Sequence, residues 1–159
     1  MLLWYVGPSV LIVFTVFRSA GIDFRLIAAG SLVPLLVDAP FRRLAVGHTI
    51  VLSVAVLTVI MLATIGRSRL LRRRLLCLPI GMMCGLLLSG AWRFTEVFWW
   101  PTLGLDIPHH GLLPALWATA LLEVVGLVAC WFAVGMFGLY EEGPRSELLR
   151  TGRLRETVE

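Results

Sequence analysis

Acidic and histidine side chains within or beside apolar stretches are the residues of this sequence best suited to chemistry. They are Asp38, His48 and Glu123, with the pair His109 and His110 in a more polar segment. Ionisable groups are costly to bury in an apolar segment, so they are functional candidates by default. Asp38 and His48 stand ten residues apart. A tight turn between them would let a carboxylate and an imidazole share a proton or a metal ion.

A metal site needs more than this pair, because protein zinc sites use at least three protein ligands. His109 and His110 could complete such a site, although a solvated histidine pair is the alternative. If the chain is an enzyme, zinc or manganese is its expected cofactor. If it is not an enzyme, no cofactor is expected. Glu123 is either a paired carboxylate that fixes the register of its helix or a catalytic group.

Composition defines the elements that must position these residues. Of 159 residues 58% are hydrophobic and 15% charged, and the mean hydropathy is +0.89. A soluble domain carries roughly 45–50% apolar and about 25% charged residues. This excludes a soluble enzyme, a disordered chain and a disulfide-rich secreted module. It predicts an all-α, polytopic helical bundle integral to the membrane.

The apolar runs predict four to five transmembrane helices, because a spanning helix needs about 20 mostly apolar residues. The predicted spans are residues 2–17, 44–65, 75–92 and 112–140. Residues 26–37 form a shorter run that contains Gly30 and Pro34, so we expect either a short, broken span or a re-entrant segment. A polar, aromatic-rich loop is expected over residues 94–111.

The arginines predict the orientation, because basic loops stay on the cytoplasmic side. Five of them lie within residues 67–74 and four within the tail, residues 141–159. The prediction is therefore a transmembrane domain over residues 1–140 and a cytoplasmic basic tail over 141–159, in the plasma (inner) membrane of a bacterium. A re-entrant segment at 26–37 would instead place the N-terminus inside. Arginines that hold loops on the cytoplasmic side account for the net positive charge of the chain. The expected partner is therefore the lipid bilayer, and nucleic acid is not expected.

Gly81, Gly85 and Ser89 recur every four residues and place small side chains along one helix face. Such a face lets two helices approach closely in a membrane. It serves either packing within the chain or a homodimer interface. A homo-oligomer or a subunit of a membrane complex is the expected assembly.

Several short motifs, in order along residues 1–104, resemble one family. They are Ala-Gly-Ser-Leu-Val-Pro-Leu-Leu-Val-Asp at 29–38, Gly-His-Thr at 47–49, Pro-Ile-Gly at 79–81, Leu-Leu-Leu-Ser-Gly-Ala-Trp at 86–92 and Phe-Trp-Trp-Pro at 98–101. Together they are similar to the membrane-bound, metal-dependent hydrolases also described as LexA-binding, inner-membrane-associated hydrolases. The resemblance implies a helical membrane fold and a metal site.

The resemblance also implies six ligand positions, most of which are substituted here. Tyr5 stands at the position of the first histidine, and Asp38 is the acid that remains of a Pro-Asp-x-x-Asp motif. His48 keeps the His-Thr element, whereas Gly85 and Ser89 replace a histidine and an aspartate. Glycine cannot bind a divalent cation through a side chain, and a neutral serine is a poor substitute for a carboxylate.

The substitutions predict a degenerate, inactive relative that acts as a structural or accessory, partner-binding subunit. The alternative is a membrane-embedded, metal-dependent hydrolase of a lipid or lipid-linked phosphate, in which a metal ion would polarise the phosphoryl group. A transporter that uses Glu123 is a third class, against which the absence of internal repeats argues.

Overall fold

The computed structural model describes residues 1–17, 22–104, 106–107, 110–112, 114–138, 140, 146, 148 and 152. Within these residues the chain is helical, and its only β pairing is one isolated bridge between Arg43 and Gly111. This confirms the all-α prediction. The long helices are α1 (Leu2–Phe17), α2 (Phe24–Asp38), α3 (Ile50–Ala63), α4 (Arg69–Ser89) and α6 (Leu116–Met136). Shorter elements are α5 (Thr95–Phe98) and the 3-10 turns η1 (Ala39–Phe41), η2 (Val46–His48) and η3 (Ala91–Arg93).

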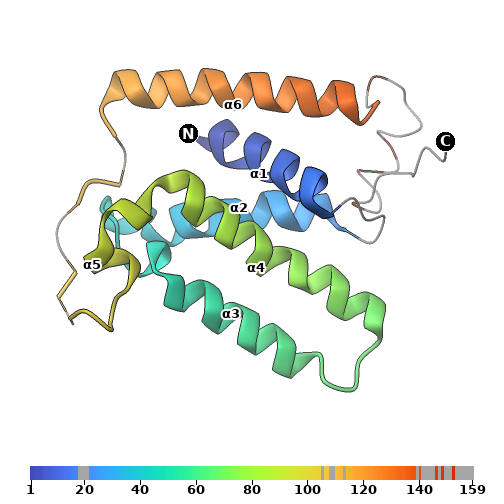
Figure 1. The fold of residues 1–159 in the computed structure, drawn as a ribbon, viewed down its shortest axis with the longest axis horizontal. Coiled ribbons are helices and arrows are strands. Elements are labelled where there is room, and N and C mark those ends of the chain that lie inside the picture. The colour runs from blue at the N-terminus through green and yellow to red at the C-terminus, as the bar shows by residue number, and fades with distance from the viewer. Residues whose placement is uncertain are drawn as a thin grey trace.

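The five long helices run side by side with alternating direction (Figure 1). The closest pairing joins α2 to α4, while α6 packs on α1 at one edge and α3 packs on α4 at the other. As a result, the turn between α3 and α4 lies at the same end of the bundle as the start of α2. Helix α5 lies at the opposite end, together with the last residue of α2, Asp38, and with η2, which packs on both helices.

Two stretches are long and apolar enough to cross a membrane, Phe24–Phe41 and Leu116–Met136. The helices α1 and α3 are apolar but shorter. The 21 residues of α4 extend about 31 Å at 1.5 Å per residue, but its first six include four arginines.

The small residues of α4 face α2 of the same chain. A Cβ added at Gly81 or Gly85 would lie under 3.0 Å from the carbonyl oxygen of Ile27 or Ser31. A Cβ at Gly30 would meet the Leu78 carbonyl in the same way. These glycines therefore pack two helix backbones of the same chain together.

The segment at 26–37 is also not broken, because α2 is continuous from Phe24 to Asp38 with Pro34 inside it. A proline removes one N–H donor and crowds the carbonyl four residues earlier. The helix survives because Asp23 caps its start, accepting hydrogen bonds from the Arg25 and Leu26 amides, and because the α4 backbone packs closely against it. The first turns of this unbroken helix line an apolar cavity together with α1 and α6.

Other boundaries also differ from the prediction. Helix α3 begins at Ile50 rather than at residue 44, because the Thr49 side chain caps it by accepting from the Leu52 amide. Helix α4 begins at Arg69 rather than at residue 75, since Ser68 caps it and Leu and Arg are good helix formers. The predicted arginine loop is thus largely helix. The predicted loop 94–111 contains the short helix α5.

Candidate functional site

Asp38 and His48 form a buried pair at one end of the bundle. Asp38 is the last residue of α2 and His48 the last of η2, and neither side chain is accessible to solvent. The His48 Nδ1 atom lies 2.7 Å from Asp38 Oδ2. The backbone amide of Ala45 donates to the same oxygen at 2.6 Å, and that of Gly47 donates to Oδ1 at 2.7 Å. Both carboxylate oxygens of Asp38 are therefore engaged by its own chain.

The local sequence explains how this turn closes. Pro40 is the second residue of the 3-10 turn η1, after which Arg42 takes a left-handed conformation with φ of 52° and reverses the chain. Gly47 then approaches so closely that a Cβ there would collide with the Asp38 carboxylate and the Pro34 carbonyl. The turn thus wraps around the carboxylate.

The free nitrogen of this imidazole defines what the pair can do. When Nδ1 carries the proton and donates it to Asp38, Nε2 keeps a lone pair that can accept a proton or bind a metal ion. His48 Nε2 is buried and has no hydrogen-bond partner among the described residues. This is the arrangement by which a carboxylate orients a metal-binding histidine.

A complete set of ligands for a divalent cation nevertheless does not come together among the residues that the structure describes. No group of three or more His, Cys, Asp or Glu side chains comes together in that part of the chain. Tyr5 is buried, and Gly85 packs against α2. The Ser89 hydroxyl donates to the Leu86 carbonyl of its own helix. One imidazole nitrogen beside a fully engaged carboxylate leaves the coordination incomplete.

Of the two remaining histidine candidates, the structure describes only His110, which makes other contacts. His109 lies outside the described residues. The His110 ring stacks on Phe94 with the ring centroids 4.1 Å apart, and its carbonyl accepts from the Leu44 amide at 2.9 Å. His110 therefore holds the loop before α6 against the turn that follows α2.

Glu123 is separate from the Asp38–His48 pair. It lies on α6, where its Oε1 accepts from the Leu3 amide at 3.3 Å and its Oε2 lies 2.9 Å from the Met1 amino nitrogen. Three residues further along α6, a Cβ on Gly126 would collide with the backbone of Leu3 and Trp4. Glu123 thus joins α6 to the start of α1, as expected of a carboxylate that fixes helix register.

Sequence reasoning missed a second buried carboxylate, that of Asp23. Besides capping α2, Asp23 Oδ2 accepts from Arg74 Nε at 2.7 Å, which links the start of α2 to α4. An aspartate three residues before the apolar run 26–37 is a helix-start signal that could have revealed the cap. The arginine partner, 51 residues away, has no comparable signal in the sequence.

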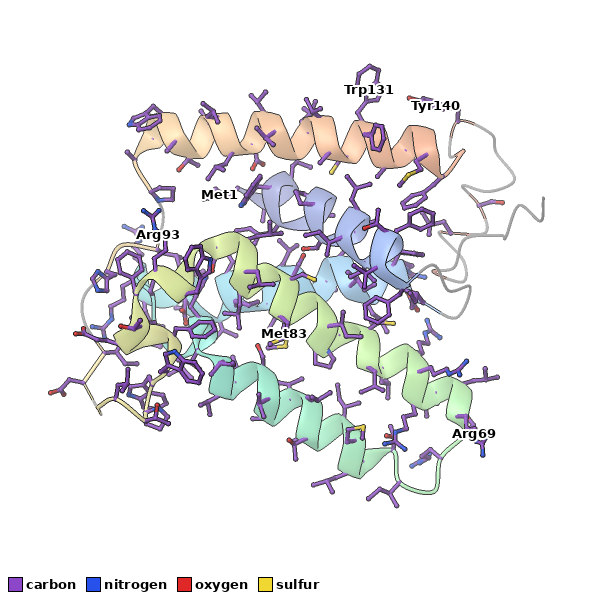
Figure 2. The ribbon with its side chains drawn as sticks, in the orientation of Figure 1. Met1, Arg69, Met83, Arg93, Trp131 and Tyr140 are labelled. Carbon is purple, nitrogen blue, oxygen red and sulfur yellow. The ribbon has the colours of Figure 1, made fainter. Side chains whose placement is uncertain are left out.

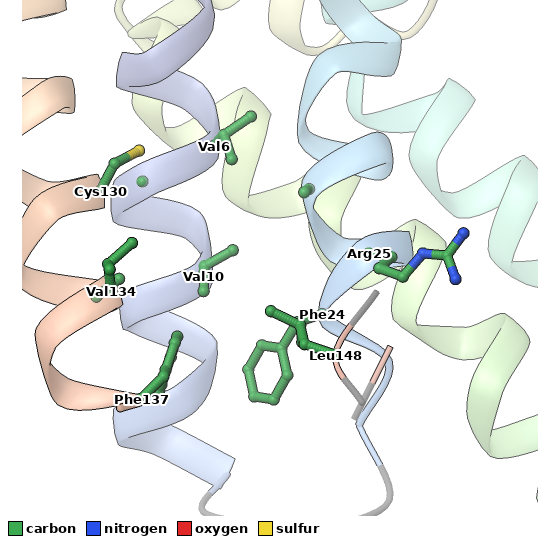
Figure 3. Close-up of a pocket in the computed structure, with 11 residues that line it drawn as sticks. Val6, Val10, Phe24, Arg25, Cys130, Val134, Phe137 and Leu148 are labelled. Atoms are coloured by element: carbon green, nitrogen blue, oxygen red, sulfur yellow. The ribbon is translucent and has the colours of Figure 1, made fainter. Parts of the chain in front are cut away.

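An apolar cavity of about 240 Å³ lies at the same end of the bundle as Asp23. Its walls come from α1, α2 and α6, with Leu148 of the tail at its edge (Figure 3). The Arg25 guanidinium points away from the neighbouring Val10 and Phe24 side chains (Figure 3). The surface that lines the cavity is almost entirely apolar.

Comparisons of the chain with protein-family models, with curated proteins and with solved structures found no match.

Proposed function

We propose that this chain is a multi-pass protein of a bacterial inner membrane, with a non-catalytic, structural or accessory role in a membrane complex. The bonding of Asp38 carries the proposal. Hydrogen bonds from two amides and an imidazole occupy its oxygens, so the carboxylate fastens the connection from α2 to α3 rather than serving a substrate.

The exposed surface supports the membrane location. Helix α6 carries large apolar side chains over most of its surface, and Figure 2 displays Trp131 directed away from the bundle. Trp117 and Trp131 are 74% and 68% exposed. In water such a face would be costly, whereas hydrocarbon accommodates it without penalty.

The charge distribution supports five spans with the α3–α4 turn in the cytoplasm. The described residues of that end carry six arginines (Arg25, Arg67, Arg69, Arg72, Arg73, Arg74) and one acidic residue, Asp23. The opposite end carries Arg42, Arg43 and Arg93 with Asp38, Glu96 and Asp106. Under the rule that basic loops stay inside, the tail is cytoplasmic as well.

A second candidate is the metal-dependent hydrolase of a lipid phosphate, and the buried, unpartnered Nε2 of His48 favours it. When bound, a divalent cation would polarise a phosphoryl oxygen and supply hydroxide. His48 would hold it through Nε2, and Asp38 would orient the imidazole.

Elemental analysis of protein purified in gentle detergent without chelator separates the two candidates. We expect metal at background level in both the wild type and a His48→Ala variant. About one zinc or manganese per chain that is lost in His48→Ala, but kept in a His110→Ala control, would overturn the proposal and favour the hydrolase.

A further inference from the structure

The end of the bundle where α3 turns into α4 presents exposed arginines among exposed apolar side chains. We call this surface the basic tip. It consists of Arg67, Arg69, Arg72 and Arg73 with Leu62, Ile65 and Leu70. Figure 2 places Arg69 at this end of the molecule and Arg93 at the other.

The described part of the chain supplies almost no negative charge to the basic tip. Among the described residues the nearby acid is Asp23, which pairs with Arg74. Arg72 donates instead to the neutral sulfur of Met61 at 3.0 Å. None of the ion pairs in the described part of the chain includes Arg67, Arg69 or Arg73.

The dipole of α4 adds to the excess of positive charge at the basic tip. Arg69, Arg72 and Arg73 lie in the first turns of the helix, where its amide groups concentrate positive charge. No acidic residue occupies that first turn. No ion pair in the described part of the chain supplies the compensating negative charge.

The apolar side chains of the basic tip indicate what supplies that charge. Leu62, Ile65 and Leu70 are 62%, 72% and 66% exposed, directly beside the arginines. If the basic tip lay in water, its leucine and isoleucine side chains would stay exposed to solvent. If it lay in hydrocarbon, its arginines would lose their solvation. The boundary between headgroups and acyl chains accommodates both, since arginine binds phosphate oxygens in a bidentate manner while its neighbours insert among acyl chains.

We propose that the basic tip is a binding site for anionic phospholipid headgroups, such as those of phosphatidylglycerol or cardiolipin, in the cytoplasmic leaflet. This inference rests on the proposed membrane location. Arg67, Arg69 and Arg73 provide the charge, and Leu70 and Ile65 anchor the tip beneath the phosphates. Lipids of this class therefore gather around the start of α4.

The test measures lipid binding to the full chain in a neutral detergent by native mass spectrometry. Phosphatidylglycerol and phosphatidylcholine with identical acyl chains are titrated separately. Each arginine near an anionic surface contributes on the order of fivefold in affinity, so an Arg69→Gln, Arg73→Gln variant should lose on the order of 25-fold of the preference for phosphatidylglycerol. An Arg69→Lys, Arg73→Lys variant should keep most of it.

A matched control removes two exposed arginines at the opposite end, with Arg42→Gln and Arg93→Gln. We expect its preference to change by less than about twofold, since this end lies about one helix length from the basic tip. Far-ultraviolet circular dichroism of each variant verifies the helical fold. Inorganic phosphate should not displace the lipid.

Two results would overturn the inference. One is equal affinity of the wild type for the two lipids, and the other is an equal loss in both double glutamine variants, which would indicate a bulk charge effect. Fractionation of the cells reveals whether the chain is in the membrane, and so separates failure of this inference from failure of the proposed function. A chain recovered from the soluble fraction overturns both proposals, whereas a membrane-bound chain without lipid preference overturns only this one.

Discussion

Adding two methyl groups between α2 and α4 should destabilise the whole bundle. The variant is Gly81→Ala with Gly85→Ala, two positions of α4 at which a Cβ would lie under 3.0 Å from a backbone carbonyl of α2. A side chain could rotate away from the new methyl group, but a backbone oxygen of a packed helix cannot. The two helices must therefore separate along the closest contact of the fold.

The magnitude follows from two opposing terms. Overpacking costs about 1–3 kcal/mol per site, and the rigid backbone places each site near the upper end. Alanine recovers about 1 kcal/mol of helix propensity relative to glycine at each position. The expected net loss is about 4 kcal/mol in the free energy of unfolding for the double variant.

The assay is reversible unfolding in mixed micelles, followed by circular dichroism. Gly135→Ala is the matched control, because its new Cβ would meet only a Tyr140 ring carbon at 3.9 Å. That control should be unchanged or more stable by up to about 1 kcal/mol. A double variant as stable as Gly135→Ala would refute the close packing of α2 on α4.

Three further predictions concern other contacts and the topology. Asp23→Ala removes the cap of α2 and the partner of Arg74, so thermal unfolding should reveal a loss of about 2 kcal/mol, and an unchanged midpoint would contradict this role. Trp4→Phe deletes the 2.9 Å hydrogen bond from the indole to the Leu88 carbonyl, and should cost about 1 kcal/mol in the same assay; a loss under 0.3 kcal/mol, roughly the measuring error, would argue against that bond. Leu103→Cys should react with a membrane-impermeant maleimide in intact cells, and Arg67→Cys only after lysis; the reverse order would invert the topology.

The sequence predicts the helical elements well where apolar runs end at strong signals. The run 2–17 coincides with α1, because the chain is uncharged throughout it. The sequence places the start of α4 too late, because a cluster of arginines before an apolar run is typical of a loop, although a helix can carry arginines beyond its apolar part. Hydropathy reports where a helix is apolar rather than where it ends.

The candidate site was predictable in part for a similar reason. A turn after an apolar run brings Asp38 and His48 together, since both lie near the same end of neighbouring helices. The engagement of Asp38 by the amides of Ala45 and Gly47 was not predictable, because it depends on a left-handed residue, Arg42, and on backbone geometry. Pairings across long sequence separation, such as that of Asp23 with Arg74, likewise depend on how α2 meets α4.

The most direct test of the central claim, that Asp38 fastens the fold rather than performing chemistry, is the free energy of unfolding of Asp38→Ala. Three hydrogen bonds to a buried carboxylate contribute about 1.5 kcal/mol or more each, so we predict a loss of at least about 4 kcal/mol. Residues kept for catalysis are commonly neutral or costly to stability. An Asp38→Ala variant as stable as the wild type, or more stable, would contradict the account.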